Sequence, residues 1–343
     1  DLLPGNELSF SPDLSPGSDE AALRKLLRGG DILDRYLRRC CERLDERFGV
    51  YLARFPSVQW AQGLLLSGEV RSQHEIYLPM EEVGPPFAHL CRSSCLYPVD
   101  TDGMRIFASP SWPDFLSRLR ADIALFNPAA LLQRLAADEG VRRRFLFNVF
   151  IPPSFGGGFG RYPRQTSFLS HWLAANRERL SAGATVLDAA CGCGEGTYEV
   201  AELLLDNRYS ADATRIHGST LEPLELVAAA FGIRPDDPVR GALFRERIKP
   251  LLHGGGGAMI RFYREDVCMP EHPRSSFDVI LCNGLLGGPL LHGRVKLAQA
   301  VSCLAARLRP GGVLLVADSF HEGWKKKQQG EVVALLRENL LML

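Results

Sequence analysis

The stretch from Val186 to Thr197, V-L-D-A-A-C-G-C-G-E-G-T, constrains the fold more than any other part of the chain. The short apolar run at 184–190 predicts a buried strand, and the Ala-, Leu- and Glu-rich run at 198–205 predicts a helix. Between them, glycines let the backbone take positive φ and approach a ligand, and the first N–H groups of the helix point toward it. This order of elements predicts a cofactor cradle that favours a carboxylate or a phosphate.

The spacing of the glycines separates two kinds of cofactor. Gly192, Gly194 and Gly196 form G-x-G-x-G, whereas the dinucleotide fingerprint is G-x-G-x-x-G. Asp188 lies four residues before the first glycine, where a carboxylate would repel a pyrophosphate and attract an ammonium group. The loop therefore favours an amino-acid moiety, and an NAD(P)-dependent oxidoreductase is the lower-ranked alternative.

The pattern V-L-D-x-x-C-G-x-G-x-G-T resembles motif I of the class I S-adenosylmethionine (SAM)-dependent methyltransferases. The resemblance covers the second half of the chain and implies SAM as the cofactor, with Asp188 and the three glycines at its amino-acid end. It also implies a doubly wound, Rossmann-like α/β fold. A glycine-rich turn with only a packing role is the alternative interpretation.

The chain after the loop alternates between predicted strands and helices, as a doubly wound fold requires. The predicted strands are 184–190, 214–219, 260–263, 277–282 and 313–317, and the predicted helices are 198–205, 223–231, 297–308 and 331–343. A complete class I sheet ends in an antiparallel strand pair, but only 26 residues follow Ala317. We therefore expect that pair to be missing or the sheet to be modified.

The resemblance implies further cofactor contacts at the strand ends. After the second strand, Thr220 stands where the family places an acid that accepts hydrogen bonds from both ribose hydroxyls. Either Thr220 makes one weaker bond, or Glu222 reaches the ribose; Glu222 as a plain helix N-terminal acid is the alternative. After the third strand, Asp266 would accept from the adenine amino group and the Val267 N–H would meet a ring nitrogen. After the fourth, Asn283 would hold the SAM ammonium group or its backbone, unless it only caps a turn.

The segment before the first strand is a candidate lid. In many class I methyltransferases, a helix at this place carries groups that close over SAM. The run 166–180 predicts such a helix, so Thr166 becomes a cofactor contact by resemblance, with Arg161, Tyr162 and Gln165 as further lid candidates. A solvated linker followed by a packed helix is the alternative.

Methyl transfer requires a lone pair of the acceptor in line with the S–C bond and the exclusion of water. A carboxylate acceptor needs no base, whereas a hydroxyl or a carbon acid does. The candidate catalytic bases are His321, Tyr162 and His292, with Glu322 as an orienting group. His321 is favoured because it follows the fifth predicted strand, at the ligand edge of the sheet.

The first half of the chain carries helical periodicity between loops. Within it, 74–80 and 104–108 have strand-like character and 84–86 predicts a turn. We predict four segments: a mobile tail at 1–20, a mostly helical N-terminal domain at 21–150, a Gly- and Pro-rich linker at 151–165, and the SAM-binding domain at 166–343.

Composition narrows the partners and the location. The 343 residues include 40 basic and 40 acidic side chains, so there is no overall charge that favours nucleic acid or an anionic membrane. No apolar run reaches the ~18 residues of a spanning helix, and the start lacks a signal-peptide pattern. The nine cysteines have no framework or metal-site spacing, so we expect reduced thiols, a cytoplasmic protein and no bound metal.

The sequence therefore predicts a SAM-dependent methyltransferase with an unidentified acceptor. The N/D-P-P-Y/F clamp for planar amines is absent after the fourth strand, which favours O- or carboxyl-methylation of a small molecule or protein side chain over nucleic acid. Residues 244–247 and 277–282 are similar to segments of the chemotaxis-receptor glutamate methyltransferases. A catalytically silent SAM-binding scaffold or sensor is the main alternative, because Thr220 replaces an acid.

Overall fold

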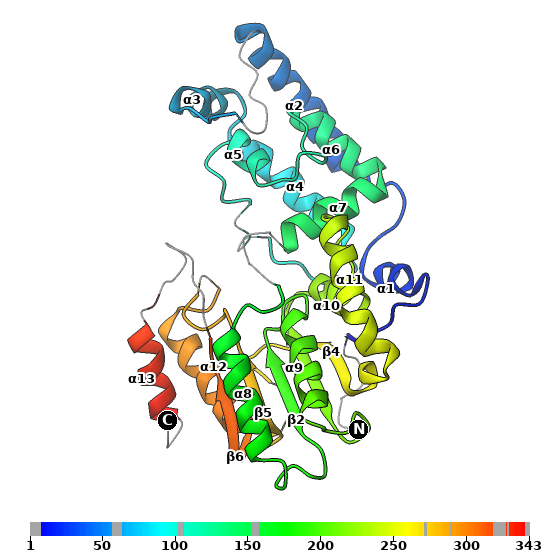
Figure 1. Ribbon diagram of the computed structural model, residues 1–343. Helices are drawn as coiled ribbons and strands as arrows, with labels where there is room; N and C mark the ends of the chain where they lie inside the picture. Colours follow the sequence, from blue (N-terminus) through cyan, green and yellow to red (C-terminus); the bar gives the residue numbers. More distant parts are fainter. Residues whose placement is uncertain are drawn as a thin grey trace. The chain divides into compact units, whose positions relative to one another are not determined.

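The computed structural model describes residues 8–56, 64–101, 104, 106–151, 158–270, 273–288, 290–317, 327 and 329–339. The chain divides into two compact units (Figure 1). The first, here called the sheet unit, comprises 1–19, 156–233 and 239–343. The second, the helical unit, comprises 20–155 and the short segment 234–238.

A six-stranded sheet forms the centre of the sheet unit, in the order β1-β4-β3-β2-β5-β6. The strands β2 to β6 are parallel to their neighbours, and β1 runs antiparallel to β4. The described strands are β1 (Ser9–Phe10), β2 (Thr185–Ala189), β3 (Arg215–Thr220), β4 (Ile260–Arg264), β5 (Phe277–Cys282) and β6 (Leu308–Leu315). The predicted doubly wound α/β fold is confirmed.

Helices cover both faces of this sheet (Figure 1). Tyr198 of α9 donates to the Ala229 carbonyl of α10, so these two helices lie together on one face, and α12 covers the other, as right-handed crossovers predict. The α12 face packs on Leu187 and Ala189 of β2, and α13 contributes Val332 to the same apolar cluster. The helices of the sheet unit are α8 (Pro163–Ala175), α9 (Glu195–Asp206), α10 (Pro223–Phe231), α11 (Pro238–His253), η2 (Gly256–Met259), α12 (Arg294–Arg307) and α13 (Gln329–Asn339).

The strand order reverses between β2 and β5. From β2 the chain proceeds to β3 and β4 on one side, and then crosses to β5 and β6 on the other. In open α/β sheets, ligands bind beyond the carboxyl ends of the strands at such a reversal. The glycine loop follows β2 and Asn283 follows β5, so the topology brings both predicted contacts to the reversal.

The prediction of a mobile tail at 1–20 is wrong for the residues that the structure describes. Ser9 and Phe10 pair with Tyr263 and Phe262 of β4. Phe10 is 8% exposed and packs edge-on against Phe231, with 5.7 Å between the ring centroids. A two-residue strand is too short to leave a sequence pattern. It supplies an antiparallel strand at the β4 edge of the sheet, a modification that the sequence did not place there.

The helical unit consists of helices around an aromatic core, as predicted for this half of the chain. Phe87, Trp112, Phe115 and Phe145 are fully buried in it, with Phe87 and Trp112 ring centroids 5.5 Å apart. Its helices are α1 (Ser18–Leu26), which begins at the boundary between the units, α2 (Arg35–Arg54), α3 (Gly68–Tyr77), α4 (Met80–Ser94), α5 (Trp112–Ser117), α6 (Pro128–Ala137) and α7 (Glu139–Phe150).

Three local expectations in this half are wrong. The strand-like run 74–80 lies mostly in α3, whose N-cap Ser67 accepts a hydrogen bond from the Val70 N–H at 3.2 Å. The described residues of 104–108 form turns, and 84–86 lies inside α4. His74 and Tyr77 of the first run contact Tyr51 of α2 instead, while Ile76 is exposed, so helix packing outweighed the local strand propensity.

Two buried arginines fix the loops of the helical unit. Arg142 is 1% exposed, and its guanidinium donates to the carbonyls of Leu135, Ala136, Arg28 and Gly30 at 2.7–3.1 Å. Arg234 pairs with Asp236 at 2.8 Å and donates to the Ile151 carbonyl, which attaches the segment 234–238 to this unit.

All nine cysteines are free thiols. Within the described residues, every helix is too short or too polar to cross a membrane.

Candidate functional site

The glycine loop makes a sharp turn between β2 and α9. Ala190, Gly192 and Gly194 all have positive φ, at 61°, 57° and 86°. The Cys191 N–H donates to the Ser219 carbonyl at 2.9 Å, which holds the loop beside the end of β3. Such a backbone forms a concave set of N–H groups, and the helix that begins at Glu195 adds its positive end. The loop can therefore bind an anion.

Two of the glycines serve different purposes. A Cβ on Gly194 would lie 2.8 Å from the Ala229 Cβ and 3.1 Å from the Phe262 ring, so this glycine allows close packing inside the protein. A Cβ on Gly192 would meet nothing within 4 Å. Open space beside a left-handed glycine is what a ligand needs to approach the backbone. Gly192 is therefore the loop glycine beside which a ligand has room to approach, and its contact with a cofactor stays a prediction.

Asp188 lies directly under the start of α9. Asp188 is 5% exposed, and its Oδ2 accepts a hydrogen bond from the Thr197 hydroxyl at 2.6 Å. A Cβ on Gly196 would be 3.5 Å from the same oxygen, an ordinary contact. Burial raises the pKa of Asp188 to about 6, and the charges of Glu195 and Glu199 add to the rise, against the effect of the Thr197 bond. A cation beside Asp188 would stabilise its charged form.

Further contacts tie the neighbouring segments to α9. Arg240 of α11 donates to Glu195 at 3.0 Å, and Glu195 is 8% exposed. The Gly160 N–H, in the segment before α8, donates to Glu199. Burial raises the pKa of Glu199. The first turn of α9 is thus held from two sides.

The two predicted ribose contacts at the end of β3 make different bonds. Glu222 is the N-cap of α10, and its Oε1 accepts from the Leu224 N–H at 3.0 Å. The Thr220 hydroxyl donates to Oε2 of Glu225 at 2.6 Å. The sequence carries no signal for Glu225, which lies five residues after Thr220, in the first turn of the next helix.

The predicted adenine contacts lie in a turn after β4. Asp266 is partly buried, and its Oδ1 accepts from the Cys268 N–H at 2.8 Å; Val267 packs beside the apolar cluster under α12. The neighbouring Glu265 is buried and pairs with Arg307 at 2.8 Å. The assignment of Asp266 and Val267 to adenine stays a prediction.

Asn283 connects three elements at the reversal point. Its Oδ1 accepts from the Gln165 side chain and from the Ala317 N–H, and its Nδ2 donates to the Gln165 Oε1, each at 2.9 Å. The start of α8 is therefore attached to the ends of β5 and β6. The Thr166 hydroxyl donates to the Tyr162 carbonyl at 3.2 Å. In this arrangement the side chains of Asn283 and Thr166 bind protein groups, and their contact with a cofactor stays a prediction.

The catalytic candidates differ in their surroundings. The Tyr162 hydroxyl is buried without a hydrogen-bond partner in the described part of the chain, and lies 3.9 Å from where a Cβ on Gly284 would be. His292 is exposed, just before α12. His321 and Glu322 lie outside the described residues. Tyr162 is thus the candidate with an unused polar group at the end of β5.

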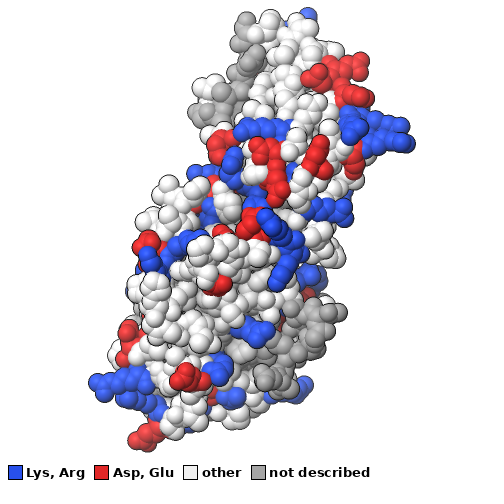
Figure 2. All heavy atoms as spheres, turned by 90° about the vertical axis from the view of Figure 1, so that its right-hand side faces the viewer, with Lys and Arg blue, Asp and Glu red and all other residues white. Residues whose placement is uncertain are grey.

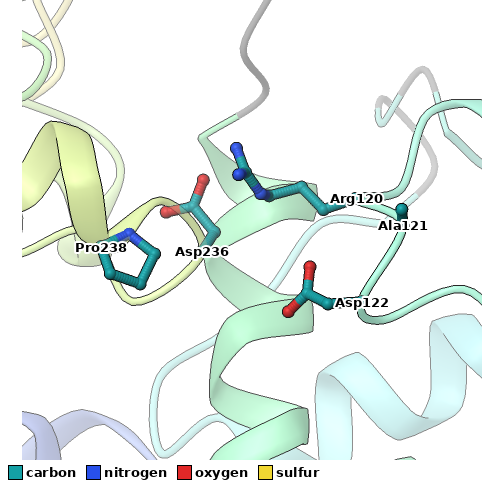
Figure 3. Close-up of a pocket in the computed structure, with 5 residues that line it drawn as sticks. All are labelled: Arg120, Ala121, Asp122, Asp236 and Pro238. Carbon is teal, nitrogen blue, oxygen red and sulfur yellow. The ribbon is translucent and has the colours of Figure 1, made fainter.

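A separate hollow lies in the helical unit (Figure 3). It is lined by Arg120, Ala121, Asp122, Asp236 and Pro238. Its charged side chains form ion pairs within the unit, such as Arg120 with Asp237 at 3.1 Å. These pairs hold the segment 234–238 in place, and they neutralise the charges with which the hollow could recognise a ligand.

No protein-family model and no curated protein matches the chain. The solved structures of similar fold include the [4+2]-cyclase SpnF, at 21% identity and a TM-score of 0.34, over 50% of this chain and 56% of that one. Phosphoethanolamine N-methyltransferase 2 of Haemonchus contortus, with S-adenosylhomocysteine, matches at 17% identity and a TM-score of 0.36, over 57% of this chain and 41% of that one. The Burkholderia thailandensis 1,6-didemethyltoxoflavin-N1-methyltransferase matches at 18% identity and a TM-score of 0.35, over 59% of this chain and 76% of that one.

The chain thus spans less than two thirds of the first two of these structures. At these values the likeness assigns no activity, and the function has to be inferred from the chain's own residues.

Proposed function

We propose that the protein is a SAM-dependent methyltransferase whose cofactor binds at the glycine loop. The observation that carries the proposal is that Asp188 and Gly192 belong to the same strand and loop. A buried carboxylate with a pKa of about 6 lies under a loop whose glycine opens on empty space, at the reversal of strand order. The two groups suit the two charges of an amino-acid moiety, since the loop N–H groups take a carboxylate and Asp188 takes an ammonium group.

SAM would supply a methyl group that its sulfonium already activates. The residues of this chain then bind and orient. The loop and Asp188 hold the amino-acid end, and Asp266 accepts from the adenine amino group. The buried Tyr162 hydroxyl, beside Gly284, hydrogen-bonds the acceptor atom and so orients its lone pair toward the methyl group. The Gln165–Asn283 pair fixes the start of α8, whose N-cap residue is Tyr162.

The favoured acceptors are a hydroxyl or carboxylate of a small molecule or a protein side chain. On the face in view, Figure 2 shows Lys and Arg side chains interleaved with Asp and Glu. A nucleic acid would bind a continuous basic surface, which this face lacks. The similarity of 244–247 and 277–282 to chemotaxis-receptor methyltransferases adds a side-chain carboxylate as one option.

The proposal is tested by incubating the protein with methyl-labelled SAM and a cell extract, followed by fractionation of the label. The control is Gly192→Asn, because asparagine tolerates a left-handed φ and its side chain would fill the open space. We expect an acceptor to be labelled by the wild type and not by the folded variant. A protein that binds SAM but labels nothing would instead be a SAM-binding scaffold.

A further inference from the structure

The turn after β4 packs on α12 through one cysteine of each. Cys268 belongs to the turn and Cys303 to the helix. The Cys303 Sγ donates to the Cys268 carbonyl at 3.5 Å, and the Cys268 Sγ donates to the Lys296 carbonyl at 3.6 Å. The Gln299 side chain donates to the same Cys268 carbonyl at 2.9 Å. Residues 296, 299 and 303 are three and four positions apart, so one face of α12 holds Cys268.

The two thiols are within reach of a reagent in solution. Six of the nine cysteines are buried, whereas Cys191, Cys268 and Cys303 are partly exposed. Met269, the residue after Cys268, is 69% exposed, so a small oxidant can approach the turn from solvent. Burial raises the pKa of the Cys268 thiol, and the charges of Asp266 and Cys303 raise it further. The two thiols are thus close enough to interact, and the reaction of Cys268 should accelerate as the pH rises.

Cys268 shares its turn with Asp266, the predicted adenine contact. The Cys268 N–H donates to Asp266 Oδ1 at 2.8 Å, and the Met269 N–H donates to the Asp266 carbonyl at 2.9 Å. A disulfide brings two sulfur atoms to ~2 Å and their Cα atoms to within ~7 Å. To form it with Cys303, the Cys268 side chain must leave the Lys296 carbonyl. The bond therefore moves the turn, and Asp266 with it.

We propose that Cys268 and Cys303 form a reversible disulfide that weakens cofactor binding. The effect on the cofactor rests on the proposed function, whereas the formation of the bond does not. Disulfides of this kind in otherwise reduced proteins are transient and act as redox sensors. The competing explanation is that both thiols only pack, as small groups between the turn and α12.

The oxidant is a small-molecule disulfide such as glutathione disulfide. The thiolate of one cysteine attacks a sulfur of the oxidant, forms a mixed disulfide and releases one glutathione. The thiolate of the other cysteine attacks the protein sulfur of that mixed disulfide and releases the second glutathione. The two protein thiols lose two electrons and two protons, and the two glutathione thiols that are formed gain them.

Peptide mapping tests whether the bond forms. The protein is equilibrated with mixtures of reduced and oxidised glutathione, alkylated and digested with trypsin. Cys268 lies in the tryptic peptide 265–274 and Cys303 in 297–307, and each peptide contains one cysteine. We expect these two peptides to be linked in the oxidised protein and separate after reduction with dithiothreitol. Oxidised protein without the linked pair would overturn the proposal.

Calorimetric titration with S-adenosylhomocysteine tests the effect on the cofactor. We expect oxidised wild type to bind ~3- to 10-fold more weakly than reduced wild type, as for the loss of one hydrogen bond. Cys303→Ser is the matched variant, because a serine hydroxyl can still donate to the Cys268 carbonyl and cannot form the bond. It should bind like the reduced wild type under both conditions, and Cys268→Ser should be equally insensitive to the oxidant.

The outcomes separate this proposal from the proposed function. A loss of affinity that persists in both serine variants would assign the effect to another thiol, such as Cys191 in the glycine loop, and would overturn the proposal. A linked pair without a loss of affinity would overturn the regulatory role while the cofactor stands. A reduced wild type that does not bind S-adenosylhomocysteine overturns the proposed function, and with it the effect of the disulfide on the cofactor.

Discussion

Asp188→Asn should make the protein more stable without ligand and less able to bind SAM. The folded state raises the pKa of Asp188 from 3.8 to about 6, mainly through burial. A pKa difference of one corresponds to 1.36 kcal/mol, so keeping this carboxylate ionised in the folded protein costs about 3 kcal/mol. Asparagine has nearly the same shape and can still accept the Thr197 hydroxyl bond. The substitution therefore removes the free-energy cost of the buried charge, and it also removes the negative partner of the SAM ammonium group.

The sign of the pH dependence follows from the raised pKa. Below pH 3.8, Asp188 is protonated in both the folded and the unfolded state, so its burial costs no folding free energy. Between 3.8 and about 6 the unfolded chain releases the proton while the folded protein retains it, so stability falls as the pH rises. Above that window the full penalty is present. In Asp188→Asn, this fall should disappear.

Hydrogen exchange of the peptide 185–206, measured at pH 5 and pH 8, would report the stability of the sheet unit alone. At pH 8 the variant should be more stable by up to about 3 kcal/mol, whereas exposed Asp206→Asn should change stability by less than about 0.5 kcal/mol. Saturating S-adenosylhomocysteine should stabilise the wild type and barely affect the variant. A variant that is less stable at pH 8, or that retains wild-type ligand protection, would refute this account of Asp188.

Three further predictions concern the stability of the two units. Gly194→Ala should destabilise the sheet unit by roughly 2–4 kcal/mol in urea denaturation, because φ is 86° and the Cβ would meet Ala229 at 2.8 Å; unchanged stability would contradict this packing role. Arg142→Leu should cost the helical unit ~3–5 kcal/mol, since four carbonyls lose the bond from this guanidinium and, of these, Ala136 keeps one from the Ile32 N–H, and exchange at 28–30 should accelerate; intact protection there would count against it. Burial lowers the pKa of His74, so the helical unit should lose stability as the pH falls below 6.5. His74→Phe should remove that loss, and a persisting acid transition would point to another group.

Much of the sheet unit was predictable because its signals are local. The predicted strand 277–282 and helix 223–231 agree with β5 and α10 residue for residue. Both are mostly apolar runs, interrupted only by Asp278 and by Glu225, and both are bounded by turn or cap residues, which makes them easy to recognise in the sequence. Helix α11 was not predicted, since Gly241 and Pro250 interrupt its pattern.

The rest depends on contacts between residues far apart in the chain. The segment 234–238 belongs to the helical unit because Arg234 reaches the Ile151 carbonyl, 83 residues away. β1 exists only because β4 offers an unpaired edge. Neither partner can be identified from local sequence, so neither feature could be predicted.

The candidate site likewise combines residues that local sequence identifies with features that depend on distant contacts. The sequence identified Asp188 and the glycines by motif, but it could not say which glycine faces open space, since that depends on Ala229 and Phe262. It also could not identify Glu225, whose position relative to Thr220 is fixed by the direction in which α10 leaves β3.

Calorimetric titration of the wild-type protein with SAM, S-adenosylhomocysteine and NAD tests the central claim most directly. We predict saturable binding of SAM and S-adenosylhomocysteine that weakens as the pH falls below about 6, where Asp188 becomes protonated, and no binding of NAD. Tight binding of NAD without a response to SAM would contradict the claim.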